Sequence, residues 1–285
     1  MIGKLFVVAT PIGNLGDITL RALSTLKNVD FLVVEDSRVS IKLLNHFKIK
    51  KPMITCFRHS NRSTYDVILR RLLGGEDAAM VSDAGVPCIS DPGENLVRIC
   101  IESGIELIPI PGVNAALTGL ILAGLECSRF CFEGFLPTNK KNRFERLNGL
   151  KHEPRTMIFY EAPHKLKNTL VDLMRCLGDR AICVARELTK IHEQFLRVSL
   201  KEAVCYFEEV PPRGEFVLVV DGCHNEDQVS EEAELNFVLD KAKRLLNNGM
   251  SVKEVAIALA SGKVRKNRIY DILLHEHKGK EGESL

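Results

Sequence analysis

The chain has 285 residues, of which 45% are hydrophobic, and a formal net charge of +2. This length allows two medium-sized domains with their own cores, and the composition excludes a disordered protein. The charge is too small to indicate nucleic-acid binding by the surface as a whole. The longest apolar stretch, residues 115–125, is interrupted by Thr118 and two glycines, so no membrane span is predicted.

The nine cysteines are odd in number and scattered, and no C-x-x-C pair occurs. We therefore expect reduced thiols, mostly in the core, and a cytoplasmic protein. The apolar run at residues 5–9 is too short for a secretory signal and leads directly into a turn. Because neither the cysteines nor the eight histidines form ligand-spaced sets, no metal site is predicted.

Strands and helices alternate through the first part of the chain, residues 1–122. Strands are predicted at residues 5–9, 31–34, 53–56, 78–81 and 105–108, and each is followed by a helix. The first four helices are predicted at 18–26, 41–47, 65–73 and 94–102, and the fifth, rich in small residues, ends near Leu122. Asp17 is predicted to be the N-cap of the first helix. The β-α alternation predicts a mostly parallel sheet, and continuous apolar strands indicate that both of its faces are covered.

A second α/β domain is predicted for residues 123–225. Its strands are expected at 130–132, 157–160, 181–185, 195–198 and 216–220, with the fourth antiparallel to a neighbour. Its helices are expected at 139–150, 166–176 and 200–207. An acidic linker then leads to helices at 235–246, 252–259 and 266–274, with Lys263, Arg265, Lys266 and Arg268 at the last junction. Residues 226–285 therefore resemble a small helix-turn-helix unit.

The loop after the strand at 78–81 is the most informative stretch. The apolar run stops abruptly at Ser82, and Asp83, Ala84 and Gly85 follow before the next helix. Ligands of open α/β sheets bind at the carboxyl ends of parallel strands. The small residues would let a ligand approach the backbone, and Asp83 offers an acceptor for a hydroxyl or an amine. The alternative is an ordinary turn between a strand and a helix.

Other strand ends carry similar loops, at residues 11–14, 35–38, 112–115, 160–161 and 186–190. Neither a dinucleotide-binding glycine motif nor a P-loop is present, and no G-x-S-x-G elbow indicates a serine hydrolase. Several of the loops have small residues against which a flat, adenosine-like ligand would fit.

The charged residues allow two interpretations each. Glu35, Asp36 and Arg38 are either part of an active site or a salt bridge at a helix start. Arg186, Glu187 and Lys190 are either part of an active site or a surface ion-pair cluster. The basic helix at 139–150 is either a solvated face or a contact for RNA phosphates. The lone histidines, His59 and His164, are candidate acids or bases but are more typical of structural residues.

Seven motifs in order resemble one known family. They are T-P-I-G-N-L from Thr10, E-D-S-R from Glu35, S-D-A-G from Ser82, S-D-P-G from Ser90, F-Y-E from Phe159, A-R-E-L-T-K from Ala185 and G-E at Gly214. Together they are similar to the ribosomal RNA small subunit methyltransferase I family, cytidine 2′-O-methyltransferases of the tetrapyrrole methylase superfamily. The resemblance covers nearly the whole chain, including the helical tail.

The resemblance implies an α/β fold of two domains with S-adenosylmethionine in the cleft between them, a helical tail and a homodimer. It also implies, as methyl acceptor, a cytidine ribose of 16S rRNA at the decoding centre of the small ribosomal subunit. The residues that match the superfamily's cofactor contacts are Pro11, Asp83, Ala84, Gly85, Asn114, Ala115, Glu161 and Leu188. The chain departs from the usual pattern at Val86, at residues 111–114 and at Lys165, and none of these departures removes a loop.

The implied reaction is an in-line attack of the ribose 2′-oxygen on the methyl group, for which alignment and a nearby base matter most. The candidate bases are Asp36, Glu187 and Lys190, and Arg38 would position a phosphate or carboxylate. Two alternatives stay open: a methyltransferase acting on a tetrapyrrole or another small acceptor, and a non-catalytic RNA-binding assembly factor. The basic helix and tail favour an RNA substrate over a small molecule.

Overall fold

The computed structural model describes residues 1–57, 60–224, 238–239, 241–242, 245–246, 250–259, 269–270 and 272–273. The chain forms two compact units, Met1–Cys223 and His224–Leu285, and each has its own hydrophobic core. Among the helices in the described part of the chain, none is long and apolar enough to cross a membrane.

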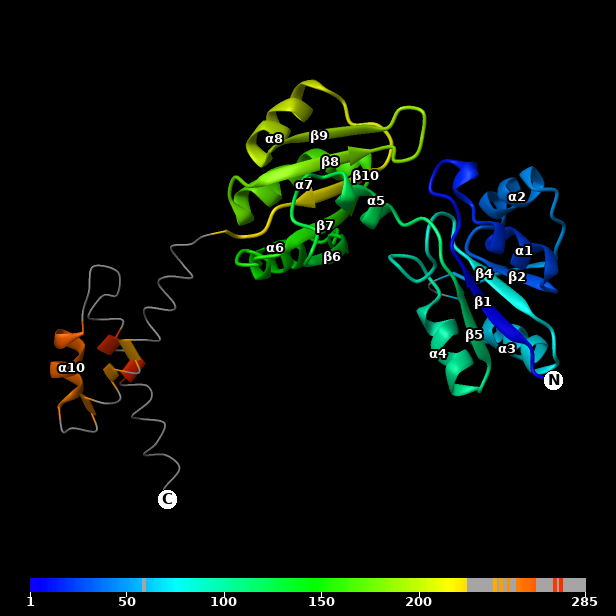
Figure 1. Cartoon of the computed structure of the whole chain (residues 1–285), viewed down its shortest axis with the longest axis horizontal. Coiled ribbons are helices and arrows are strands. Elements are labelled where there is room, and N and C mark those ends of the chain that lie inside the picture. Colours follow the sequence, from blue (N-terminus) through cyan, green and yellow to red (C-terminus); the bar gives the residue numbers. More distant parts are fainter. Residues whose placement is uncertain are drawn as a thin grey trace, which may run out of the picture. The chain divides into compact units, whose positions relative to one another are not determined.

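The first sheet of the larger unit is entirely parallel (Figure 1). Its strand order is β3-β2-β4-β1-β5. The strands are β1 (Lys4–Val8), β2 (Phe31–Val34), β3 (Met53–Thr55), β4 (Ala78–Val81) and β5 (Glu106–Ile110). The helices are α1 (Leu20–Asn28), α2 (Ser37–His46), α3 (Arg62–Leu73), α4 (Glu94–Glu102) and α5 (Ala115–Ile121). Every residue of β2 and β4 is buried, which confirms the prediction of a sheet covered on both faces.

The predicted start of the first helix is wrong. Asp17 lies in a short 3₁₀ helix, η1 (Leu15–Asp17), and the N-cap of α1 is Thr19. The Thr19 hydroxyl accepts a hydrogen bond from the backbone N–H of Ala22 at 3.0 Å. Asn14 caps the 3₁₀ turn by accepting from Gly16 N, so two polar residues share the entry to α1. Similarly, α2 begins four residues before the predicted position 41, because Asp36 caps it.

The second sheet is mixed, with the order β6-β7-β10-β8-β9. Its strands are β6 (Phe130–Phe135), β7 (Thr156–Glu161), β8 (Ala181–Arg186), β9 (Gln194–Ser199) and β10 (Phe216–Val220), and its helices are α6 (Lys140–Gly149), α7 (Pro163–Leu177) and α8 (Leu200–Glu209). β6 and β7 are parallel, whereas β10 is antiparallel to both of its neighbours. The predicted antiparallel strand is confirmed as β9, which pairs with β8.

Helix α5 follows the first sheet in sequence but packs on the second. Ala116 and Leu120 join a core cluster with residues of β7, β8 and β10, on the face of the second sheet opposite the main core. Figure 1 shows α5 beside β10. The chain therefore crosses directly from the end of β5 onto the second sheet, which brings loops of both sheets together.

The smaller unit contains α10 (Val252–Ala258), which agrees with the helix predicted at 252–259. A capping box of Ser251 and Glu254 begins it. Its core consists of Val238, Ala242, Val255, Ala256, Ile269 and Leu273. The helices predicted at 235–246 and 266–274 lie partly outside the described residues, and the basic cluster at 263–268 lies wholly outside them.

Candidate functional site

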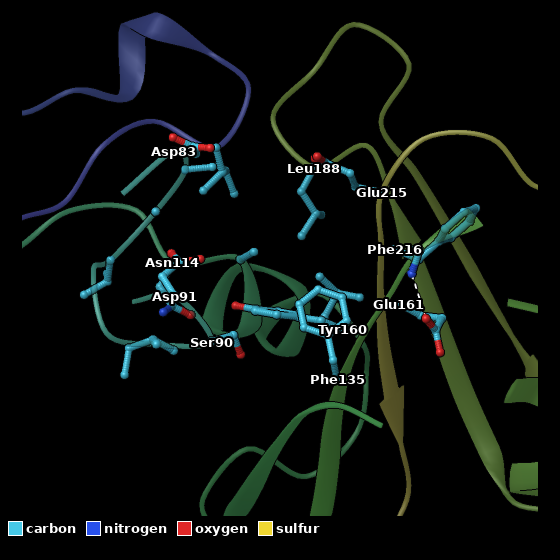
Figure 2. A pocket seen from close by; sticks show the side chains of 18 of the residues that line it. Asp83, Ser90, Asp91, Asn114, Phe135, Tyr160, Glu161, Leu188, Glu215 and Phe216 are labelled. Carbon is cyan, nitrogen blue, oxygen red and sulfur yellow. Dashed lines mark hydrogen bonds between the residues drawn. The ribbon is translucent and has the colours of Figure 1, made fainter. Parts of the chain in front are cut away.

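Loops from both sheets of the larger unit line a cavity of about 520 Å³ (Figure 2). The first sheet contributes the loops after β1, β2, β4 and β5, and the second contributes the ends of β6, β7 and β8 and the start of β10. This volume falls within the range of about 300–1,000 Å³ typical of small-molecule sites. The cavity lies at the carboxyl edge of the parallel sheet, where the sequence predicts a ligand.

Most of the residues expected to bind a cofactor line this cavity. They are Asp83, Ala84, Gly85, Asn114, Ala115, Glu161 and Leu188. Pro11 is buried and is not among the lining residues, but its neighbour Ile12 is. Ser90, Asp91 and Phe135 also line the cavity but are not predicted to do so, although Ser90 and Asp91 belong to one of the quoted motifs. Tyr160, from the predicted loop at 160–161, lines it as well.

Gly85 allows the loop after β4 to lie against the loop after β1. The backbone N–H of Thr10 donates to the carbonyl of Gly85 at 2.8 Å, and the N–H of Gly85 donates back at 3.1 Å. Gly85 has a φ of +81°, and a Cβ at this position would lie 3.3 Å from Cγ2 of Ile12. A side chain would strain the backbone and press on Ile12, so glycine fits this part of the wall best.

Tyr160 ties helix α5 to the second sheet beside the cavity. Its hydroxyl oxygen accepts a hydrogen bond from the backbone N–H of Ala116 at 3.1 Å. Its ring packs edge-on against Phe132 and Phe135, with centroid distances of 5.0 and 5.6 Å. Burial raises the pKa of the Tyr160 phenol, so the group stays neutral and serves as an anchor.

Glu161 is only 4% exposed, and both of its carboxylate oxygens have donors. The N–H of Ala162 donates to Oε1 at 2.8 Å, and the hydroxyl of Thr169 donates to Oε2 at 2.6 Å. The carboxylate therefore fixes the entry of α7, and its cost of burial is offset by these bonds.

The cavity is strongly acidic. Among the described residues that line it, none is Lys, Arg or His, whereas five carry carboxyl groups: Glu35, Asp83, Asp91, Glu161 and Glu215. Burial, followed by the charges of Glu35 and Asp83, raises the pKa of Asp91 to about 6. Such a site favours a positively charged ligand and repels phosphates. No group of three or more His, Cys, Asp or Glu side chains in the described part of the chain is arranged to hold a metal ion.

Asp36 and Arg38 form a salt bridge, which is one of the two interpretations that the sequence allows. The guanidinium donates to Asp36 through Nε at 3.0 Å and Nη2 at 2.6 Å, and the Arg38 side chain is 87% exposed. These hydrogen bonds lower the pKa of Asp36 to about 2, so its carboxylate is a weak proton acceptor. The N–H of Asp36 donates to Oδ1 of Asp83 at 3.1 Å, which joins the pair to the cavity wall.

Glu187 and Lys190 also form an ion pair, and they flank Leu188. Lys190 Nζ lies 2.9 Å from Oε1 of Glu187 and 2.9 Å from Oε2 of Glu215. Burial alone would raise the pKa of Glu187, but the hydrogen bonds from Lys190 and Glu215 outweigh it and lower the pKa. Neither residue lines the cavity, whereas Leu188 and Glu215 do.

The same loop contacts the first sheet. The hydroxyl of Thr189 accepts from Asn14 N at 3.1 Å, and Lys190 packs closely over Gly13. Thus the loops after β1 and β8 meet, and they hold Leu188 in the cavity wall.

Two of the four cations of the basic helix α6 are engaged within the protein. Arg143 pairs with Asp172 at 2.6 Å with both side chains largely buried, and Arg146 pairs with Glu133 at 2.6 Å. The contact with RNA phosphates considered above therefore rests on Lys140 and Lys141. His164 is exposed at the start of α7, and His59 lies outside the described residues.

Comparisons with known proteins agree with this architecture. A family model described as Tetrapyrrole (Corrin/Porphyrin) Methylases matches residues 4–204. A Synechocystis protein named ribosomal RNA small subunit methyltransferase I is 46% identical over 274 residues, which cover 95% of this chain and 98% of that protein. A Bacillus subtilis protein of the same name is 42% identical, covering 94% of this chain and 93% of its own length.

Solved structures show the same fold at low identity. Cobalt precorrin-4 methyltransferase superposes with a TM-score of 0.59 at 18% identity, covering 76% of this chain and 94% of that chain. A uroporphyrin-III C-methyltransferase from Thermus thermophilus, complexed with S-adenosylhomocysteine, has a TM-score of 0.55 at 17% identity, covering 77% of this chain and 97% of that chain.

Proposed function

Because this chain belongs to the tetrapyrrole methylases and, within them, to the ribosomal RNA small subunit methyltransferase I family, we propose that it methylates 16S rRNA with S-adenosylmethionine. The acceptor is the ribose 2′-oxygen of a cytidine at the decoding centre. The protein acts in the cytoplasm as a homodimer. The proposed acceptor atom, compartment and homodimer are supported by the family resemblance of the motifs. The proposed cofactor is supported by the cavity.

The acidic cavity is the observation that supports this cofactor best. S-adenosylmethionine carries a positive sulfonium, and at neutral pH its ammonium and carboxylate groups cancel, so its net charge is positive. Carboxylates of Asp83, Asp91 and Glu35 line the cavity and no described lining residue opposes them with a positive charge. A phosphate-bearing cofactor would be repelled by the same groups. The charge of the site thus fits a sulfonium cofactor.

The residues that would hold the cofactor are those of the loops around the cavity. We propose backbone contacts at Ala84, Gly85 and Ala115, polar contacts at Asp83 and Asn114, and apolar contact with Leu188. Glu161 would shape the far wall through the start of α7, and Pro11 would act through the buried loop that carries Ile12. When bound, S-adenosylmethionine supplies an electrophilic methyl group on a positively charged sulfur.

The contribution of the chain is mainly alignment, because the methyl group is already activated. Holding two reactants in the reacting geometry is worth up to about 7–11 kcal/mol. We propose that Arg38, exposed at the edge of the site, positions an RNA phosphate, with Asp36 fixing its orientation. Glu187 and Lys190 would hold the loop of Leu188 at the mouth of the cavity and contact the acceptor strand from there.

A transfer assay with methyl-tritiated S-adenosylmethionine tests the proposal. The acceptors are 30S subunits that lack 2′-O-methylation, free 16S rRNA and a uroporphyrin. Nuclease digestion and nucleoside analysis should place the label on a cytidine ribose of the decoding centre. Label on the uroporphyrin alone would show a small-acceptor methylase. Binding of the cofactor without transfer to any acceptor would contradict the proposed substrate, and no binding would favour a non-catalytic factor.

A further inference from the structure

A second hollow of about 390 Å³ adjoins the cavity. Two residues, Glu35 and Asp83, line both spaces. If the larger cavity holds the cofactor, as proposed above, methyl transfer has to occur where a second ligand can meet it. The boundary formed by Glu35 and Asp83 is such a place.

The second hollow has an aromatic surface suited to a nucleobase. Phe57, which follows β3, lines it and is 51% exposed. Its backbone is held by Ser60, because Phe57 N donates to the Ser60 hydroxyl at 2.8 Å and Ser60 N donates to the Phe57 carbonyl at 2.9 Å. A large exposed ring on a fixed backbone is a platform on which bases of single-stranded nucleic acid stack.

The hollow also has a cation on its rim. Arg38 lines it, and the fork of hydrogen bonds to Asp36 holds the guanidinium in place. An aromatic ring, a fixed guanidinium and carboxylates in one hollow match the base, the phosphate and the hydroxyls of a nucleotide.

Glu35, which lies at the boundary, has one carboxylate oxygen without a donor in the described part of the chain. Its Oε2 is buried and has no hydrogen-bond partner among the described residues. In contrast, Asp36 is engaged by Arg38, and Oδ1 of Asp83 accepts from Asp36 N. A buried carboxylate oxygen without a donor is costly, and a ligand hydroxyl would satisfy it. Burial and the nearby charge of Asp83 raise the pKa of Glu35 more than a hydrogen bond from the Asp83 backbone lowers it, which makes Glu35 a better proton acceptor than Asp36.

We propose that the second hollow is the acceptor-nucleoside site, in which the base stacks on Phe57 and the ribose 2′-hydroxyl donates to Oε2 of Glu35. In the reaction the 2′-oxygen forms a bond to the methyl carbon, and the carbon–sulfur bond breaks with its electron pair remaining on sulfur. The hydroxyl proton passes to the Glu35 carboxylate and then to water. This inference rests on the proposed function and adds the place of the acceptor and the identity of its base.

Two variants separate the roles of stacking and proton transfer. Phe57→Leu keeps an apolar side chain and removes the aromatic face, so it should raise the KM for the RNA about tenfold or more. Because Phe57 lines only the second hollow, the variant should bind S-adenosylmethionine with unchanged affinity. Glu35→Gln keeps the shape of the side chain and should lower kcat about 100-fold or more at saturating cofactor, with little effect on KM.

Tyr206→Ala is the matched control, because Tyr206 is also an exposed aromatic residue, at 44%, and lines neither space. It should transfer methyl groups like the wild type. Normal cofactor binding by Phe57→Leu confirms an intact fold; if that variant then has a wild-type KM, the stacking site is refuted. A wild-type kcat for Glu35→Gln refutes the proton acceptor. Failure of the wild type itself to methylate any RNA would refute the proposed function, and this inference would fall with it.

Discussion

Asp91→Asn should stabilise the protein at neutral pH while weakening the cofactor site. Burial, followed by the charges of Glu35 and Asp83, raises the pKa of Asp91 to about 6, from about 3.9 in an unfolded chain. Above pH 6 the folded protein therefore carries a carboxylate that is less stable than it is in the unfolded chain. Asparagine removes this charge, and its side-chain oxygen can still accept a hydrogen bond.

The pKa of Asp91 is higher by about two in the folded protein than in the unfolded chain, and this difference sets an upper limit on the gain in the free energy of unfolding. At about 1.4 kcal/mol for each unit, the limit is about 3 kcal/mol. Asp91 is only partly buried, so solvent screening reduces the expected gain to about 1 kcal/mol. For a domain of this size this corresponds to a rise in Tm of about 2–4 °C at pH 7.5.

The dependence on pH distinguishes this cause from others. Well below pH 4, Asp91 is protonated and neutral in both the folded and the unfolded protein, so asparagine should bring no gain. The stability cost of the ionised Asp91 develops as the pH rises from about 4 to about 6, and the difference in Tm between variant and wild type should grow over the same interval.

Thermal unfolding at a series of pH values, with isothermal titration of S-adenosylmethionine at pH 7.5, measures both effects. We expect the variant to bind the cofactor about three- to tenfold more weakly, since one attracting charge is lost. A Tm at pH 7.5 that is equal to or below that of the wild type would refute the electrostatic reasoning. So would a gain that persists unchanged at pH 4.

Three further substitutions test other parts of the site. Gly85→Ala, at a φ of +81°, should cost about 1–3 kcal/mol of stability and weaken cofactor binding; unchanged titration and Tm values would contradict this. Tyr160→Phe leaves the N–H of Ala116 without its acceptor and should lower the free energy of unfolding by about 1–2 kcal/mol, measured with urea, whereas an unchanged midpoint would exclude the anchoring role. Arg143→Ala leaves Asp172 largely buried without its cation and should lower the free energy of unfolding by about 2 kcal/mol. An unchanged free energy of unfolding, as expected for a solvated cation, would show that the pair is unimportant.

The sequence predicts the parallel sheet well because its strands are short, apolar and buried on both faces, as in β2 and β4. Helix starts are predicted less well, because several polar residues compete for each cap. Asp17 is as good a capping residue as Thr19, but it is the last residue of the 3₁₀ turn, so Thr19 caps α1 instead.

The lining of the cavity is predicted in part. The loops at strand ends are visible in the sequence as motifs, but the clustering of carboxylates in the cavity is not. Asp91 meets Glu35 and Asp83 only after β2 and β4 lie side by side, and the interaction changes its pKa. Likewise, nothing in the sequence of α5 indicates that Ala116 packs on the second sheet and donates to Tyr160.

The acidic wall of the cavity has a consequence for turnover. If the cavity binds S-adenosylmethionine as proposed, methyl transfer converts the sulfonium into a neutral thioether. The carboxylates of Asp83 and Asp91 then lose part of the charge that they attract. The neutral product should therefore bind more weakly than S-adenosylmethionine, so the enzyme would resist inhibition by its own product. This difference in affinity between cofactor and product needs no moving lid, since methyl transfer itself removes the charge that the cavity attracts.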